Sequence, residues 1–164
     1  MLAILSPAKS LNSESTKNLP ATSTPLFLDD ANELAKVMRK YSPPELASIM
    51  KLSDKLSTLN VARFEQWSAN HEVTGLLPAI LTFNGDVYEG FNAQSLSSAG
   101  LYKTNQMIRI LSGLYGLLRP LDAMRPYRLE MGTKLEQPFR SLAQFWQTKI
   151  TKAPVSYTHL RAHE

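Results

Sequence analysis

Residues 106–133 constrain the fold of this chain more than any other stretch. Glycine and proline interrupt the stretch at Gly113, Gly116, Pro120, Pro126 and Gly132. Each proline fixes one backbone dihedral, so the stretch is stiff before any ligand arrives. Between these breaks, aromatic and aliphatic side chains alternate with arginines, whose planar donor forks fit phosphate or carboxylate. We therefore expect a binding surface for an anion, built on a rigid base.

The predicted anion-binding residues are basic side chains and two glycines whose amides could face a phosphate backbone. They are Lys9, Arg109, Gly113, Gly116, Arg119, Arg125 and Arg128. Contacts of this kind hold a nucleic acid without reading its bases. We expect the arginines to form one contiguous cationic wall.

Charge is distributed unevenly along the chain. The formal net charge is +4, but residues 1–100 hold eight Lys and Arg against ten Asp and Glu. Residues 101–152 hold nine Lys and Arg against three Asp and Glu. Such an excess focuses a positive potential and attracts polyanions in a salt-dependent way, although a solvated basic face would give the same count.

Length and composition indicate one domain. With 164 residues, of which 43% are hydrophobic, the chain can bury a real core. The absence of cysteine excludes disulfides, thiolate metal sites and cysteine nucleophiles and suits a reducing compartment. The apolar start, residues 1–5, is too short for a signal peptide or a membrane span. We expect a cytoplasmic monomer with no membrane partner and no cofactor.

The local patterns predict a mixed α/β fold. Strands are expected at residues 2–5, as a buried strand, and at 78–83, with a hairpin at Asn84-Gly85 returning through Val87 and Tyr88. Helices are expected at 31–41 with an aspartate cap (Asp29 or Asp30), 42–50, 53–67, 97–111 and 139–151. The second of these begins with a capping box, Ser42 to Glu45. Residues 112–116 are compared with a helix-hairpin-helix, although two residues separate the glycines where the usual motif has one.

Two further groups of side chains are candidates. Lys51, Lys55 and Arg63 could extend the basic surface or could be ordinary solvated helix residues. Asp86, Tyr88 and Glu130 form a possible polar site, in which Asp86 could hold a metal, act as a base or bond to its own backbone. No metal-ligand spacing is present, so no metal site is expected.

Six blocks of sequence carry a resemblance, in a fixed order: residues 6–9, 52–56, 85–88, 111–122, 126–132 and 145–146. In that order they resemble the YaaA family of bacterial peroxide-stress resistance proteins. The resemblance implies an unusual YaaA-type fold with a small sheet, surrounding helices and a helix-hairpin-helix-like element. It also implies a cytosolic protein that binds duplex and branched DNA in a positive cleft and limits free intracellular iron and oxidative DNA damage.

The chain departs from that family near its end. Family members are longer, so residues 1–152 are interpreted as one incomplete YaaA-like domain. Residues 153–164 match nothing expected there and are interpreted as a non-native tail, so His159 and His163 are left out of any site.

Two classes of function remain open. The first is a non-enzymatic protein that binds the DNA backbone. The second is an enzyme or small-anion binder acting on a phosphorylated metabolite or nucleotide, with Lys9, Asp86, Arg119, Arg128 and Glu130 around the substrate. The sequence lacks a phosphate-binding glycine loop, a dinucleotide fingerprint and a nucleophile elbow, which favours the first class.

Overall fold

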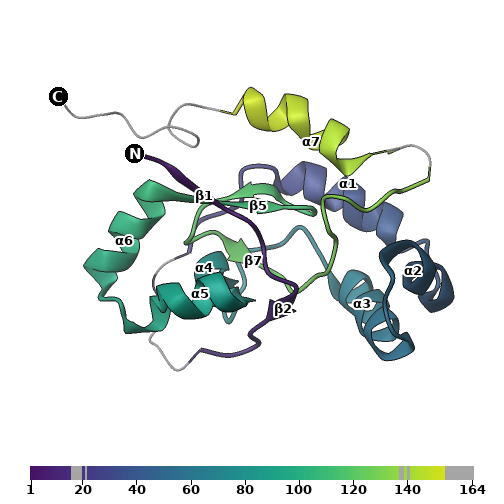
Figure 1. Ribbon diagram of the computed structural model, residues 1–164, viewed down its shortest axis with the longest axis horizontal. Coiled ribbons are helices and arrows are strands. Elements are labelled where there is room, and N and C mark those ends of the chain that lie inside the picture. Colours follow the sequence, from purple (N-terminus) through teal and green to yellow (C-terminus); the bar gives the residue numbers. More distant parts are fainter. Residues whose placement is uncertain (16–19, 21, 137–138, 140, 154–164) are drawn as a thin grey trace.

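The computed structural model describes residues 1–15, 20, 22–136, 139 and 141–153, and within them the predicted mixed α/β fold is confirmed. Helices flank three small sheets (Figure 1). The largest sheet has the order β1-β5-β6, with β1 parallel to β5 and β5 antiparallel to β6. Its strands are β1 (Ala3–Leu5), β5 (Ile108–Ser112) and β6 (Gly116–Leu118). The antiparallel pairs are β2 (Ser10–Leu11) with β4 (Phe83–Asn84), and β3 (Leu77–Pro78) with β7 (Ala123–Met124).

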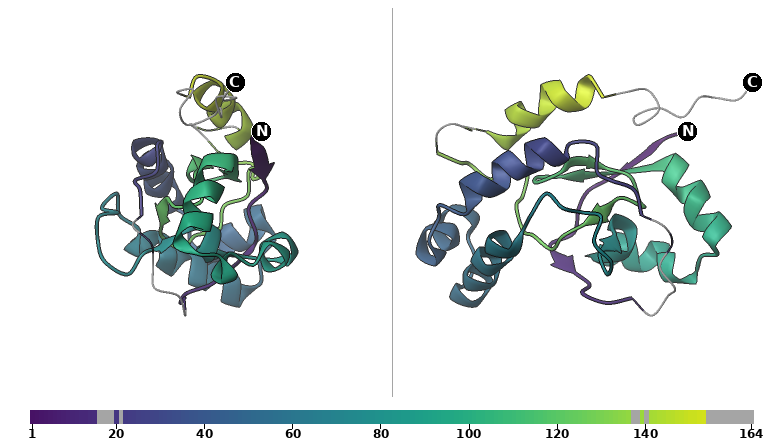
Figure 2. Two further views of the ribbon diagram at one scale, coloured as in Figure 1. Left: turned by 90° about the vertical axis from the view of Figure 1, so that its left-hand side faces the viewer. Right: turned by 180° about the vertical axis from the view of Figure 1, so that it is seen from behind.

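The helices lie in groups around these sheets. They are α1 (Leu28–Met38), α2 (Pro43–Met50), α3 (Asp54–Gln66), α4 (Ala79–Thr82), α5 (Asp86–Phe91), α6 (Ser98–Met107) and α7 (Leu142–Thr151), with a short 3-10 turn at Ala93–Ser95. Helices α1 and α7 lie along one side, and α4, α5 and α6 lie on the other (Figures 1 and 2). An ion pair between Lys149 Nζ and Asp30 Oδ1, 2.8 Å long, joins α7 to α1.

The helix starts that depend on serine caps were predicted correctly. Glu45 Oε2 accepts a hydrogen bond from the backbone amide of Ser42 at 2.7 Å, which closes the capping box of α2. Ser53 Oγ accepts from the amide of Leu56 at the start of α3. The aspartate cap predicted for the first helix is wrong, because α1 begins at Leu28 and has no side-chain cap.

The strand and hairpin predicted for residues 78–88 are wrong. The apolar run forms the buried turn of helix α4, whose N-terminus follows Pro78. Gly85 is extended, with a φ of 174°, and α5 begins directly after it, at the position where the returning strand was predicted. Short apolar runs fit a buried helix as well as a strand, and only tertiary packing decides between them.

The expected helix-hairpin-helix is instead a β-hairpin. Helix α6 ends at Met107, and residues 113–115 form the turn between β5 and β6. The backbone carbonyl of Gly113 accepts from Trp146 Nε1 of α7 at 2.8 Å. A Cβ on Gly116, whose φ is +73°, would stand 2.5 Å from the Trp146 ring, so the glycine is needed for this close packing.

Strand β1 is exposed, contrary to the prediction of a buried strand. It lies at the edge of the sheet, and Ile4 is 60% exposed, whereas Ile110 of the neighbouring β5 is fully buried. The burial of β5 comes from its position between β1 and β6. The apolar sequence of β1 therefore predicted a strand correctly but not its burial.

The last helix begins later than predicted, at Leu142, and is capped by Ser141. Pro138 and the tail from residue 154 onward, both part of the sequence predictions, lie outside the described residues. Among the described residues, no helix has the length and apolar character needed to cross a membrane.

Candidate anion-binding site

Three segments that are distant in sequence meet around Lys9. A hollow of about 350 Å³ is lined by residues 6–10 and 84–88. A second hollow, of about 230 Å³, is lined by residues 7–9 and 127–131. Residues 7–9 belong to both, so Lys9 stands between the turn before α5 and the chain that follows β7.

Lys9 and Arg128 share one carboxylate. Lys9 Nζ lies 3.6 Å from Glu130 Oε1, and Arg128 Nη2 lies 3.4 Å from the same oxygen. The Lys9 side chain is 70% exposed and that of Glu130 is 45% exposed. The Lys9–Glu130 pair is exposed and contributes little to stability, so Lys9 remains available to another anion, whereas the Arg128 side chain is only 18% exposed.

The buried amide of Asn60 fixes the backbone of Arg128. Its Nδ2 donates to the carbonyl of Arg128 at 2.9 Å, and its Oδ1 accepts from the amide of Arg128 at 3.0 Å. These two hydrogen bonds, called the clamp, come from one side chain of α3 and pair the backbone N–H and C=O of Arg128 as a neighbouring strand would. Arg128 is therefore held rigidly against α3.

Arg63 lies one helical turn beyond Asn60, and its charge repels that of Arg128. Burial lowers the pKa of the Arg63 guanidinium, and the nearby positive charge of Arg128 lowers it further. Arg63 makes no hydrogen bond or ion pair with any described residue, and the buried Nε of Arg128 also lacks a partner among them. Unpaired donors and like charges held together are unfavourable until an anion bridges them.

Three of the predicted arginines are engaged elsewhere in the fold. Arg109 is only 3% exposed, and its Nη1 donates to the carbonyls of Asn105 and Ile108. Arg125 Nη2 donates to the carbonyl of Asn70 at 2.7 Å. Arg109, Arg119 and Arg125 contact different segments of the chain. The structure therefore does not bring these three arginines and Arg128 together as one cationic wall.

Arg119 is bound to a buried carboxylate. Its Nε and Nη2 lie 3.2 and 3.1 Å from Asp122 Oδ1, and Asp122 is fully buried. Asp122 also accepts from the backbone amide of Arg119 and from the hydroxyl of Ser23 at 2.6 Å. Four donors thus compensate the buried charge, and the pair fixes the turn before β7.

The remaining predicted residues are separated from one another. Gly113 and Gly116 are buried beneath α7 and residue 129, so they are not part of the candidate surface. Lys51 and Lys55 are exposed near the start of α3. Arg63 lies two turns further on, about 12 Å along the helix from Lys55. Of these three basic residues, Arg63 is the one that the structure places at Arg128.

The polar candidates support the loop that carries Lys9. The hydroxyl of Tyr88 donates to the carbonyl of Ser6 at 2.6 Å, and burial raises the pKa of Tyr88. Asp86 is exposed in the first turn of α5 and lines the larger hollow together with Lys9. Tyr88 therefore positions the loop, Glu130 pairs with Lys9 and Arg128, and Asp86 shares the larger hollow with Lys9.

A buried network of aromatic side chains lies on the hairpin turn. The Tyr115 hydroxyl accepts from Trp67 Nε1 and from the amide of Arg125, and it lies 2.6 Å from His71 Nε2. Burial, and then the charge of Arg125, lowers the pKa of His71 to about 4, so the imidazole is neutral at pH 7. Since the hydroxyl already accepts two bonds, its own proton is directed to His71 Nε2.

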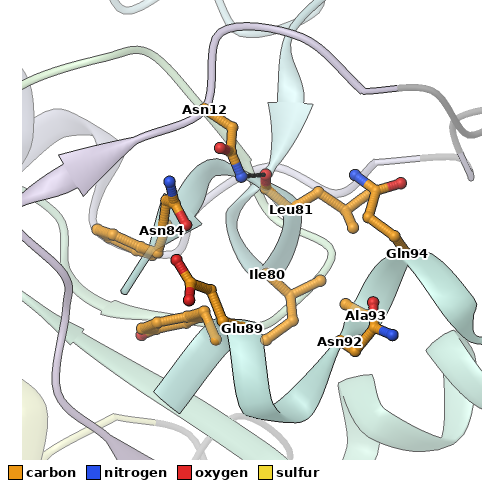
Figure 3. A pocket seen from close by; sticks show the side chains of 10 residues that line it. Asn12, Ile80, Leu81, Asn84, Glu89, Asn92, Ala93 and Gln94 are labelled. Carbon is orange, nitrogen blue, oxygen red and sulfur yellow. Dashed lines mark hydrogen bonds between the residues drawn. The ribbon is translucent and has the colours of Figure 1, made fainter. Parts of the chain in front are cut away.

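A pocket of about 390 Å³ was not found by sequence reasoning. Asn84 and Glu89 point toward one another on one side of it, and Gln94 lies on the opposite side (Figure 3). Asn12 lies between them and donates to the carbonyl of Leu81 at 3.2 Å. The lining residues come from the loop after β2, from α4, β4 and α5, and from the 3-10 turn and the residue before it, and no sequence motif connects these segments. Among the described residues, no group of three or more His, Asp or Glu side chains could hold a metal ion.

Comparison with known proteins gives the family of the chain. The family model described as peroxide stress protein YaaA matches residues 1–158, and the chain belongs to this family. A UPF0246 protein of Burkholderia ambifaria strain MC40-6 is 49% identical over 154 residues, which are 93% of this chain and 59% of that protein. A UPF0246 protein of Idiomarina loihiensis is 50% identical over 153 residues, again 93% of this chain and 59% of that protein. The chain thus spans about three fifths of the length of these relatives.

Proposed function

We propose that this protein binds the phosphate backbone of DNA through the cation cluster, defined as Lys9, Arg63 and Arg128. The observation that carries the proposal is the pair of arginines, which lie close together with donor groups left unpaired. A phosphate group supplies negative charge and acceptors in addition to the one carboxylate, Glu130, that Lys9 and Arg128 share. The whole protein would act in the peroxide-stress response by binding duplex or branched DNA without sequence preference.

We also propose that the protein helps to limit free intracellular iron and oxidative damage to DNA. The support is the family description as a peroxide stress protein. Deleting the encoding gene is expected to raise free iron, measured by electron paramagnetic resonance on whole cells under peroxide. Unchanged iron in the deletion strain would refute this part of the proposal without touching the DNA-binding part.

Fluorescence anisotropy with a labelled duplex, a four-way junction and a single strand tests DNA binding. The apparent affinity should fall steeply with salt, with a slope of about 0.9 per phosphate contact on a logarithmic plot for duplex DNA. Changing Lys9→Ala or Arg63→Ala should lower that slope by about one contact each. Lys103→Ala, which removes an exposed lysine on α6, is the matched control and should have less effect.

A second candidate, binding of a compact phosphorylated metabolite, is favoured by the hollow of about 230 Å³ that holds Lys9, Arg128 and Glu130 together. A small ligand that fits this hollow would raise the melting temperature in proportion to the logarithm of its concentration. If sugar phosphates or nucleotides stabilise the protein while DNA of every form fails to bind, the DNA-binding proposal is refuted.

A further inference from the structure

We propose that the amide-lined pocket beside α5, defined as the pocket of Figure 3, takes an unpaired guanine base of DNA. The proposal deepens the proposed function, because it gives a base-binding site beside the phosphate-binding cluster. The pocket and the hollow at Lys9 share Asn84 and Tyr88 in their walls. A nucleotide could therefore place its phosphate toward Lys9 and its base in the pocket.

The polar side chains of the pocket leave hydrogen-bonding groups unused. Asn84, Glu89 and Asn92 make no side-chain hydrogen bond to any described residue. Asn12 uses its Nδ2 on Leu81, which fixes the amide and leaves its Oδ1 as an acceptor. These groups converge on a cavity of about 390 Å³, which is large enough for one base.

The chemistry of these groups selects the kind of ligand. Glu89 is a carboxylate and accepts only, so it disfavours an anion and favours an edge with neighbouring donors. Asn84 lies beside Glu89 with its oxygen toward the carboxylate and its nitrogen on the far side (Figure 3), and this nitrogen can donate to an acceptor of the base. Guanine presents two adjacent N–H donors, at N1 and at its exocyclic amine, beside the O6 acceptor. Adenine, cytosine and thymine lack this combination on one edge.

The remaining walls suit a flat ring. Ile80, Leu81 and Phe83 supply apolar surface, and the Phe83 ring packs on Tyr88 with centroids 5.5 Å apart. An apolar surface with a few polar groups at the edge is the usual form of a small-ligand site. Because these edge groups of guanine are paired in a duplex, the pocket can receive the base only from an unpaired or extruded nucleotide.

The first test uses 2′-deoxyguanosine, which has no phosphate and so does not depend on the cation cluster. In ¹H–¹⁵N spectra, titration should shift the side-chain amide signals of Asn12 and Asn84. Glu89→Gln should abolish those shifts, whereas Glu72→Gln, which removes an exposed carboxylate elsewhere, should keep them. Absence of shifts in the unaltered protein, or their persistence in Glu89→Gln, would overturn the proposal regardless of whether the protein binds DNA.

The second test compares single-stranded oligothymidines that carry one central guanine, one hypoxanthine or no substitution. Hypoxanthine lacks the exocyclic amine, so the guanine strand should bind about tenfold more tightly than the other two. Glu89→Gln should remove this preference and leave the affinity for plain oligothymidine equal to that of Glu72→Gln. Arg63→Ala should weaken all three strands by the same factor. Equal binding of the three strands by the unaltered protein would refute the base site. If no strand binds but 2′-deoxyguanosine still shifts the amide signals, only the proposed contacts to the phosphate backbone are refuted.

Discussion

Arg119 and Arg63 carry the same guanidinium group, and the structure uses them in opposite ways. Arg119 is surrounded by acceptors and bound to a carboxylate that is fully buried. Arg63 is half-buried beside another arginine and has no acceptor among the described residues. Arg109 and Arg119, which are close in sequence, therefore stabilise the fold. Lys9, Arg63 and Arg128 instead come from three distant segments, and Lys9 and Arg128 share one carboxylate, that of Glu130.

The difference lies in the supply of internal acceptors. In residues 109–125 the arginines stand within reach of backbone carbonyls at the end of α6, of Asp122 and of the loop at Asn70. At Arg128 the neighbouring polar group is an exposed glutamate that two cations share. Counting basic residues along the chain does not distinguish these cases, because the acceptors come from other segments.

The largest effect is expected at the buried pair. Asp122→Ala should lower the free energy of unfolding by about 3–5 kcal/mol, because it removes the buried carboxylate to which Arg119 and the Ser23 hydroxyl donate. Urea unfolding at pH 7 measures the loss. A loss below about 1 kcal/mol would show that Arg119 is not a structural residue and would remove the contrast with Arg63.

The next effect depends on pH and concerns His71. Its pKa in the folded protein is about 4, below the ordinary value of 6.5, so the unfolded chain binds more protons between these values. The stabilisation is complete above pH 6.5 and is lost as the pH falls toward 4. Between pH 7.5 and 4.5 the protein should lose about 2–3 kcal/mol more than His71→Gln does, measured by urea unfolding at both values. Equal losses in the two proteins would contradict this account.

A smaller effect is expected at the clamp that holds Arg128. Asn60→Ala should cost about 2 kcal/mol, since both backbone groups of Arg128 lose their partner. Asn60→Asp keeps the acceptor for the Arg128 amide but sets a second oxygen against the Arg128 carbonyl, so it should not restore the clamp. Because the clamp positions the cation cluster, Asn60→Ala should also weaken DNA binding at temperatures where the protein is still folded. Unchanged binding there would show that Arg128 does not need a fixed position.

The smallest effect on stability is expected at Arg63 itself. Arg63→Ala removes no hydrogen bond to a described residue and relieves repulsion, so the free energy of unfolding should change by less than about 0.5 kcal/mol. Chemical denaturation of this variant beside Arg119→Ala gives the comparison directly. Similar large losses in both would mean that Arg63 has a structural partner.

Sequence reasoning predicted the features that depend on neighbouring residues. The capping box at Ser42 and the serine cap at Ser53 were correct, because their bonds close within three residues. The β-hairpin at Gly113 and Gly116 was mistaken for a helix-hairpin-helix, because glycines mark a tight turn without showing which elements it joins. The exposure of the Ile4 side chain results from its position in an edge strand, which no local sequence pattern indicates.

The candidate site was predicted in part. Lys9 and Arg128 were named from the sequence, and Arg63 was named as a possible extension, but their meeting depends on how α3 packs against residue 128. The Asn60 clamp joins positions 68 residues apart and has no signal in a single sequence. The pocket of Figure 3 was missed for the same reason, since its amides come from separate segments.

The Nε–H signals of the arginines test the central contrast most directly. Their ¹H–¹⁵N correlations can be assigned with arginine-to-lysine variants and followed while duplex DNA is added at low salt. Our account predicts that the signals of Arg63 and Arg128 shift as DNA binds, while those of Arg109 and Arg119 stay in place. Shifts at Arg109 and Arg119, with none at Arg63 and Arg128, would contradict it.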